Sequence, residues 1–311
     1  MIRVGAGFYA TGVVHNAAYA GIAHDQIASV RSLALRPELD CIEAVWPQDG
    51  AERAPLRQLL SDAGVLCVHA AGGQMRRQSI DPHSEDPEER TRGMQRLKLM
   101  VEAASDMGAR MIVLCSGPDP APERRDSAKT QLVAALQELC LHAQDLRSED
   151  PLWISFEHFD RHLDQKRLLG PTQETVEVIR RVRRHSPNIG ILADLSHIVQ
   201  LGEPIDEAID TIGDLLIHAH VANCGIDPNY PDVFGDSHCR FGDPGSAVTL
   251  SEVTVFLAAL ERNGYSRRVL PTGHALISVE MKTPPEGDPG MSIANGLRML
   301  AQAAAMVTAL D

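Results

Sequence analysis

The sequence predicts an α/β protein that folds as a single (β/α)8 TIM barrel, and three observations lead to this prediction. Eight short apolar runs alternate with eight helical patterns, which is the element count of such a barrel. The length of 311 residues lies within the range of single barrels, so we expect one domain over residues 1–311. The last four apolar runs each carry a metal-ligating type of residue at or near their end.

The first half of the chain contains four of the expected strands, each a short run of apolar and β-branched residues. They cover residues 4–10, 41–46, 65–70 and 111–115. Apolar residues at helical spacing predict the intervening helices over residues 24–36, 51–63, 85–107 and 127–146. Gly64 and Gly108 are the expected ends of the second and third helices, because glycine adopts the left-handed conformation that ends a helix.

The second half repeats the alternation and adds a long connection. Strands are expected at residues 153–157, 190–194, 216–221 and 276–281, and helices near 172–184, 206–213, 250–263 and 290–309. Residues 71–84 and 222–248 are expected to form long loops on the face where barrel active sites lie. A doubly wound open sheet is the alternative, but Gly5-Ala-Gly7 lacks the third glycine and the following helix of a phosphate-binding turn.

Charge and composition exclude several classes of function. The net charge of −13 argues against a nucleic-acid partner, and the basic residues at 180–184 are interpreted as the solvated face of a helix. The apolar C-terminal segment is interrupted by Asn295, Arg298 and Gln302, so it is not expected to cross a membrane. Six cysteines without CxxC spacing, and the lack of a signal-peptide pattern, favour a reduced cytoplasmic protein.

Four residues in the second half predict a metal site. The carboxyl ends of barrel strands meet at one rim, so the polar residues that end these four runs are expected to lie together. Buried carboxylates need a cation or basic partners, because an unpaired buried charge costs several kcal/mol. Each residue alone also fits a polar group that caps a loop, but the repetition favours one Mn²⁺, Mg²⁺ or Co²⁺ ion. The expected ligands are Glu157, Asp194, His220 and Glu280.

Further polar residues are candidates for binding a substrate. His197 follows the expected metal ligand Asp194 by three residues, and His69 ends the third strand. His238 and Arg240 belong to the polar segment Asp236-Ser-His-Cys-Arg240 of the second long loop. A structural role remains the alternative for each, as it does for Glu43 in the second strand.

These motifs resemble a known family, the xylose isomerase-like TIM barrels, also called the sugar phosphate isomerase/epimerase superfamily. The resemblance covers nearly the whole chain. It rests on Ser155-Phe-Glu157, Ala193-Asp-Leu-Ser-His197, His218-Ala-His-Val221, Gly235-Asp-Ser-His238, Gly242-Asp-Pro-Gly245 and Ser278-Val-Glu-Met-Lys282. It implies that Glu157 and Glu280 are both metal ligands and the acid/base pair, and that His197 binds substrate. Barrels of this family are commonly dimers or tetramers, so it also implies a homo-oligomer.

Two positions differ from the ketose 3-epimerases of this family. These enzymes have Arg where this chain has Ile226, and Glu where it has Leu163. The pattern therefore does not predict a simple ketose 3-epimerase. The DNA-cleaving branch of the family is disfavoured by the charge of −13.

Three functions remain open on the sequence. The first is a metal-dependent isomerase or epimerase that acts through an enediolate on an unphosphorylated or small sugar. The second is a metal-dependent lyase or dehydratase acting on a keto-sugar, a keto-cyclitol or a 3-keto-glycoside. The third is a barrel that binds carbohydrate or supports a partner enzyme without turnover, which the intact set of four expected ligands disfavours.

Overall fold

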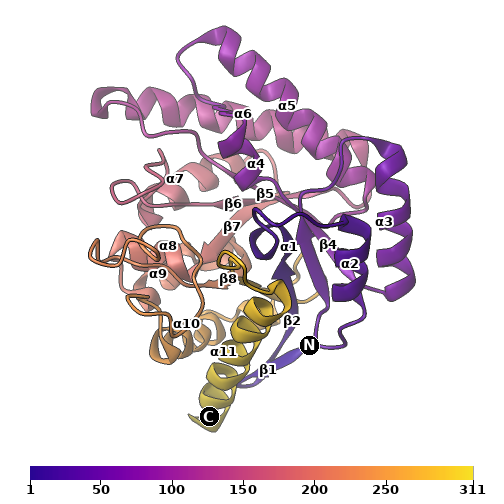
Figure 1. The fold of residues 1–311 in the computed structure, drawn as a ribbon. Helices are drawn as coiled ribbons and strands as arrows, with labels where there is room; N and C mark the ends of the chain where they lie inside the picture. The colour runs from indigo at the N-terminus through magenta and orange to yellow at the C-terminus, as the bar shows by residue number, and fades with distance from the viewer. Residues whose placement is uncertain (311) are drawn as a thin grey trace.

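Eight parallel strands close into a barrel in the computed structural model, which describes residues 1–310 (Figure 1). Neighbouring strands pair in sequence order, and the first pairs with the last to close the barrel. A short strand, β1 (Ile2–Val4), precedes the barrel and runs antiparallel to the first barrel strand. The barrel strands are β2 (Gly7–Val14), β3 (Cys41–Ala44), β4 (Leu66–Ala70), β5 (Met111–Cys115), β6 (Trp153–Glu157), β7 (Ile189–Asp194), β8 (Leu216–Ala222) and β9 (Ala275–Glu280).

Helices surround the barrel and bury their apolar sides against it (Figure 1). The long helix α11 lies beside β1, and Gly5 N–H donates to Thr308 Oγ1 at 3.0 Å. The α-helices are α1 (His15–Ala18), α2 (Gln26–Ala34), α3 (Gly50–Ala63), α4 (Gly72–Arg77), α5 (Pro87–Asp106), α6 (Arg125–Leu146), α7 (Thr172–Arg183), α8 (Leu195–Leu201), α9 (Ile205–Ile212), α10 (Leu250–Arg262) and α11 (Pro289–Leu310).

The predicted barrel is confirmed, but the expected first strand at residues 4–10 is wrong. The structure divides this run into β1 and β2 at a turn where Gly5 has a φ of 54°. Glycine reaches this left-handed conformation without the steric penalty of a side chain, so the chain reverses there. The barrel strand then continues to Val14, past the predicted end.

The long loop expected at residues 71–84 contains a helix, α4, and an additional helix, α8, begins directly after β7. Neither has enough turns to display the periodicity by which longer helices are recognised. The second long connection is confirmed as irregular chain between β8 and α10. Gly64 and Gly108 adopt the expected left-handed conformation, with φ of 67° and 73°.

Strand register decides which side chains fill the barrel. Paired residues on neighbouring parallel strands point to the same face, and successive residues alternate. Gly12 of β2 pairs with Ser278 of β9 at the closing seam, and a Cβ on Gly12 would lie 2.1 Å from Ser278 Oγ. The register of β7 against β8 shifts between Ile191 and Leu192. The shift leaves His218 paired with Leu192, so His218 and His220 both face inward.

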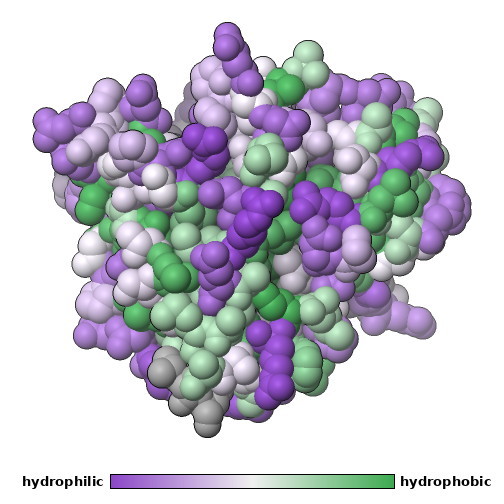
Figure 2. All heavy atoms as spheres, turned by 60° about the horizontal axis from the view of Figure 1, so that its bottom comes forward, coloured by the Kyte–Doolittle hydropathy of each residue, from purple (hydrophilic) through white to green (hydrophobic). Residues whose placement is uncertain are grey.

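The molecular surface shows no separation into apolar and polar halves on the face in view. Figure 2 shows hydrophobic side chains interspersed with hydrophilic ones on the face that includes the bottom of Figure 1. Among the exposed hydrophobic residues are Phe8 of β2 and Met306 of α11. No helix within residues 1–310 is long and apolar enough to span a membrane. All six cysteines are free and buried, as expected.

Candidate metal centre and active site

Four polar side chains converge inside one end of the barrel. Glu157, Asp194 and Glu280 are the last residues of β6, β7 and β9, and His220 lies two residues before the end of β8. One ligand atom from each residue lies within 4.8 Å of the others. The structure thus brings together the four residues that the sequence predicts as metal ligands.

The contacts within this cluster leave atoms without hydrogen-bond partners. His220 Nδ1 lies 2.8 Å from Glu280 Oε2 and 3.6 Å from Asp194 Oδ2. Neither contact has the geometry of a hydrogen bond, so Nδ1 of His220 and Oδ2 of Asp194 lack partners among the described residues. Buried polar atoms are normally satisfied, and a cation placed among these converging atoms would supply the partners that they lack. Three carboxylates and one imidazole are donors that suit a hard divalent cation, so the residues fit the metal.

Asp194 is oriented by the helix that follows it. Its Oδ1 accepts hydrogen bonds from the backbone N–H and the hydroxyl of Ser196, both at 2.6 Å. Asp194 is thus the N-cap of α8, a position that favours aspartate because its carboxylate satisfies a free N–H at the helix start. The cap uses one carboxylate oxygen and leaves the other directed to the cluster.

Glu43 on β3 lies behind His220 and contacts two histidines of β8. Its carboxylate is 2.9 Å from His218 Nε2 and 3.2 Å from His220 Nε2. Ser155 Oγ lies 3.3 Å from Nδ1 of His218 and completes the chain of contacts. Burial opposes ionisation of Glu43, but the charges of both histidines and their hydrogen bonds hold its pKa well below the usual range. The sequence left open whether Glu43 binds substrate or has a structural role. In the structure it is the partner of His218 and His220, which is the structural role.

Opposite charges stabilise one another throughout the cluster. Burial lowers the pKa of His220, but the charge of Glu43 and contacts with Asp194 and Glu280 raise it well above the usual value. Burial likewise opposes ionisation of Glu280, while His238 and His220 hold its pKa well below the usual range. Glu280 is thus held ionised, which is the form of a carboxylate that binds a cation.

Two further histidines lie directly beside the two glutamates. His197 Nε2 is 3.3 Å from Glu157 Oε1, and His238 Nδ1 is 3.2 Å from Glu280 Oε1. His238 also contacts Asp236 at 2.9 Å, and its φ of 45° is unusual for a residue with a side chain. Burial lowers the pKa of His197, but neighbouring carboxylates raise it to about 9. The structure brings two of the three predicted substrate-binding histidines, His197 and His238, to the cluster.

Arg76 is a site residue that the sequence did not reveal. It belongs to α4 and lines, with Glu157, His220, His238 and Glu280, a small cavity of about 40 Å³. Its guanidinium lies over the ring of Phe159, 5.1 Å from the centroid, which packs the cation against the cavity wall. The one sequence signal was the position of Arg76 within a long βα loop.

The structure does not bring His69 to the cluster. His69 pairs in register with Ile112 of β5, which pairs with Ile154 of β6. Ile154 precedes the inward-facing Ser155, so strand alternation places His69 on the outer side of the barrel, towards the helices. Burial lowers the pKa of His69 to about 4, so the ring is neutral near pH 7.

Arg240 is also not brought to the cluster. Its side chain is 45% exposed and pairs with Asp243 at 3.0 Å within the same loop. This local ion pair holds the guanidinium on the surface, and Arg240 is not among the residues that line the small cavity.

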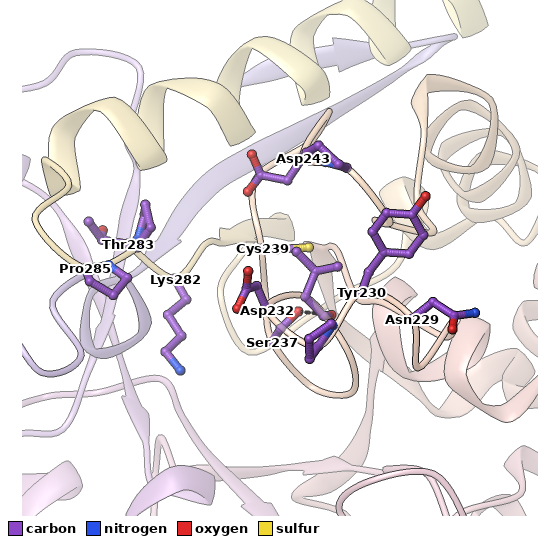
Figure 3. A pocket seen from close by; sticks show the side chains of 13 residues that line it. Asn229, Tyr230, Asp232, Ser237, Cys239, Asp243, Lys282, Thr283 and Pro285 are labelled. Atoms are coloured by element: carbon purple, nitrogen blue, oxygen red, sulfur yellow. Dashed lines mark hydrogen bonds between the residues drawn. The ribbon is translucent and has the colours of Figure 1, made fainter.

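A larger cavity of about 720 Å³ lies between the β8–α10 connection and the chain that follows β9. Figure 3 shows Tyr230, Asp232 and Asp243 on one side of it and Lys282 on the other. Cys239 lines this cavity, whereas the preceding residue, His238, lines the small one. The two cavities share no lining residue, and the cluster residues Glu157, His220 and Glu280 line only the small one of the two.

Solved structures with similar folds include sugar epimerases and an epimerase-like protein. One is a D-tagatose 3-epimerase-like protein, with a TM-score of 0.74 and 17% identity over 97% of this chain and 99% of that one. A second is 3-keto-D-glucoside 4-epimerase from E. coli, with a TM-score of 0.68 and 14% identity over 94% and 99%. A third is D-allulose 3-epimerase from Methylomonas sp. in complex with D-allulose, with a TM-score of 0.64 and 19% identity over 99% and 96%.

At these identities the likeness concerns the fold alone. Comparison with curated proteins finds no significant match. The model of the xylose isomerase-like TIM barrel family matches residues 33–303, which is most of the chain and includes all four residues of the cluster. On this match, and with a barrel whose rim gathers Glu157, Asp194, His220 and Glu280, the chain belongs to the xylose isomerase-like TIM barrel family.

Proposed function

We propose that this protein is a divalent-metal-dependent isomerase or epimerase of a small sugar. The observation that carries the proposal is the position of two glutamates, Glu157 on β6 and Glu280 on β9. They come from strands three apart around the barrel, line the same cavity and lie with His220 and Asp194 in one cluster. Two carboxylates that approach one cavity from different strands are suited to removing and returning a proton.

The proposed metal ligands are Glu157, Asp194, His220 and Glu280, and the proposed ion is Mn²⁺, Mg²⁺ or Co²⁺. When bound, such an ion supplies Lewis-acid stabilisation of the negative charge that develops on a substrate carbonyl oxygen. The orphaned atoms Oδ2 of Asp194 and Nδ1 of His220 support this assignment.

The glutamates are the proposed acid/base pair. One glutamate, ionised at the start, removes the proton from the carbon beside the substrate carbonyl and keeps it. The other glutamate, protonated at the start, donates its own proton in return. Return to the opposite face of the same carbon is epimerisation, and return to the neighbouring carbon is aldose–ketose isomerisation. His197 beside Glu157 and His238 beside Glu280 are positioned to bind substrate hydroxyl groups. Because His69 and Arg240 lie away from the cavity, neither is part of the proposed site.

The test follows proton exchange in D₂O. We would incubate the protein, with each metal, with a panel of ketoses, keto-inositols and 3-keto-glycosides, and remove the metal before recording proton NMR spectra. The expected result is a product that has exchanged hydrogen for deuterium and has otherwise the same molecular formula as the substrate. Loss of water or of an aglycone would instead identify the lyase.

The matched variants are Glu280→Gln and Glu286→Gln, the latter at an exposed position in the chain after β9. We expect Glu280→Gln to lower kcat by at least about 100-fold, the range for loss of a general acid or base. Glu286→Gln should retain the rate. Equal rates in both variants, or no exchange with any member of the panel, would contradict the proposal.

A further inference from the structure

Four arginines line one cavity beside the candidate active site. The cavity has a volume of about 390 Å³, and its arginines come from α4, α5 and the connection after β6. Asp81 and Glu89 are its only acidic lining residues among those described. Such an excess of cations is unusual in a chain of net charge −13. The arginines are Arg76, Arg92, Arg96 and Arg167.

Most of this positive charge is not paired closely with a carboxylate. Arg96 donates to the backbone carbonyl of Gln78 at 3.2 Å, which leaves its charge unbalanced. The Nε of Arg167 is buried and has no hydrogen-bond partner among the described residues. Arg76 approaches Asp236 only to 3.8 Å, and Arg92 pairs loosely with an exposed glutamate on its own helix, at 3.6 Å. The cavity therefore presents guanidinium groups with free donors.

The arginine cavity adjoins the small cavity of the metal cluster. Arg76 lines both cavities and is the residue that connects them. Cys115 pairs in register with Glu157, and it lies close enough to Arg76 and Arg167 for their charges to act on its thiol. Burial raises the pKa of the Cys115 thiol to about 11, whereas the charges of Arg76 and Arg167 act to lower it. Arg92 and Arg96 are exposed on α5, so the arginines extend from the surface to the cluster.

We propose that this cavity binds an oxyanion of the substrate, a carboxylate or a phosphate, at the end remote from the reacting carbonyl. Guanidinium groups bind both anions through paired hydrogen bonds, and a cationic entrance attracts an anionic substrate towards an otherwise acidic site. This inference concerns the substrate, and it rests on the proposed function for the reaction that the substrate undergoes. It replaces the expectation of an unphosphorylated sugar with an anionic one, such as a keto-sugar acid or a ketose phosphate.

The first experiment compares substrate classes with the metal-loaded protein. Neutral ketohexoses, ketohexuronic acids and ketose phosphates are offered under the same conditions, and deuterium exchange is followed by NMR. We expect kcat/KM for one anionic class to exceed that for neutral ketoses by at least about tenfold. The anionic class with the higher kcat/KM shows whether the oxyanion is a carboxylate or a phosphate. A neutral ketose with a kcat/KM equal to or above both anionic classes would overturn the proposal.

The second experiment uses arginine variants. Arg167→Gln and the surface variant Arg96→Gln should each raise KM for the anionic substrate by about tenfold and change KM for a neutral ketose little. Arg31→Gln, exposed on α2 and away from the cavity, is the matched control. An equal change in KM for neutral and anionic substrates would mean that the arginines are structural, and the proposal would fail.

A binding measurement separates this inference from the proposed reaction. Inorganic phosphate and acetate are titrated calorimetrically into the protein without added metal. Binding of either ion that weakens in Arg167→Gln and Arg96→Gln, but not in Arg31→Gln, supports the anion site even if no sugar reacts. If sugars do react but neither ion binds to the unmodified protein, the anion site is overturned and the proposed reaction stands.

Discussion

At the scale of single residues, Glu43 fixes the orientation of the His220 ring in the cluster. Nε2 of His220 lies 3.2 Å from the carboxylate of Glu43, and Nδ1 points to Asp194 and Glu280. A carboxylate that accepts one ring N–H leaves the lone pair of the other nitrogen for a metal and raises its basicity. Glu43 therefore positions a metal ligand without being one in the proposed site.

Glu43→Gln should weaken the binding of Mn²⁺ by about 10- to 100-fold, the usual cost of losing such a partner of a metal ligand. The substitution keeps the shape of the side chain and removes its charge. Isothermal titration calorimetry measures the affinity, and Glu38→Gln on the exposed surface is the control. Unchanged affinity in Glu43→Gln would contradict the positioning role.

The residues at the strand ends were predictable from the sequence, but Arg76 was not. Strand alternation and the shared rim are local consequences of chain direction, so the order of residues alone is enough to place Glu157, Asp194 and Glu280 together. Arg76 reaches the site through the orientation of α4, a short helix within a long connection. That orientation depends on tertiary packing, which sequence periodicity does not record.

At the scale of elements, an ion network joins α7 to its surroundings. Glu174 in the first turn of α7 lies 2.7 Å from Arg161 and 2.5 Å from Lys129 of α6. Hydrogen bonds from Arg161 and Lys129 lower the pKa of Glu174 from 4.5 to about 2, although burial opposes this. The network thus ties two helices to the connection that follows β6.

The lowered pKa predicts a pH-dependent contribution to stability. Because Glu174 ionises more readily in the folded state, its contribution is present above about pH 4.5 and is lost as the pH falls towards 2. Glu174→Gln should lower the free energy of unfolding by on the order of 1 kcal/mol at pH 6, since solvent weakens a partly exposed pair. The difference should shrink at pH 3.

Urea unfolding at both pH values, followed by circular dichroism, measures this difference. Glu177→Gln, exposed on the same helix, is the control. A difference between the unmodified protein and Glu174→Gln that is the same at pH 6 and pH 3 would argue against the network.

At the scale of the whole molecule, closure of the barrel depends on the seam between β2 and β9. The two strands pair over residues 9–13 and 275–279, and Gly12 faces Ser278 there. A Cβ on Gly12 would lie 3.1 Å from the Cβ of Ser278 and 2.1 Å from its Oγ. Ser278 Oγ is buried without a hydrogen-bond partner among the described residues, so its removal should cost little.

Gly12→Ala should therefore lower the free energy of unfolding by about 1–3 kcal/mol, the usual cost of overpacking. Ser278→Ala in the same chain should restore much of this loss, because it removes the clashing Oγ. Urea unfolding of the two single variants and the double variant measures the coupling between the positions. If the changes in the free energy of unfolding of the two single variants simply add in the double variant, the contact between Gly12 and Ser278 is not the source of the lost stability.

The double use of Asp194 has a consequence for how this chain can change over evolution. Its two carboxylate oxygens serve different tasks, one at the start of α8 and one in the cluster. Asparagine could replace aspartate in the first task, since it caps helices equally well, but it would bring no negative charge to the second. A descendant that no longer used the proposed metal site would therefore remain free to drift from Asp to Asn at this position without loss of fold. The identity of this one residue would record whether selection for the cation persists in a lineage.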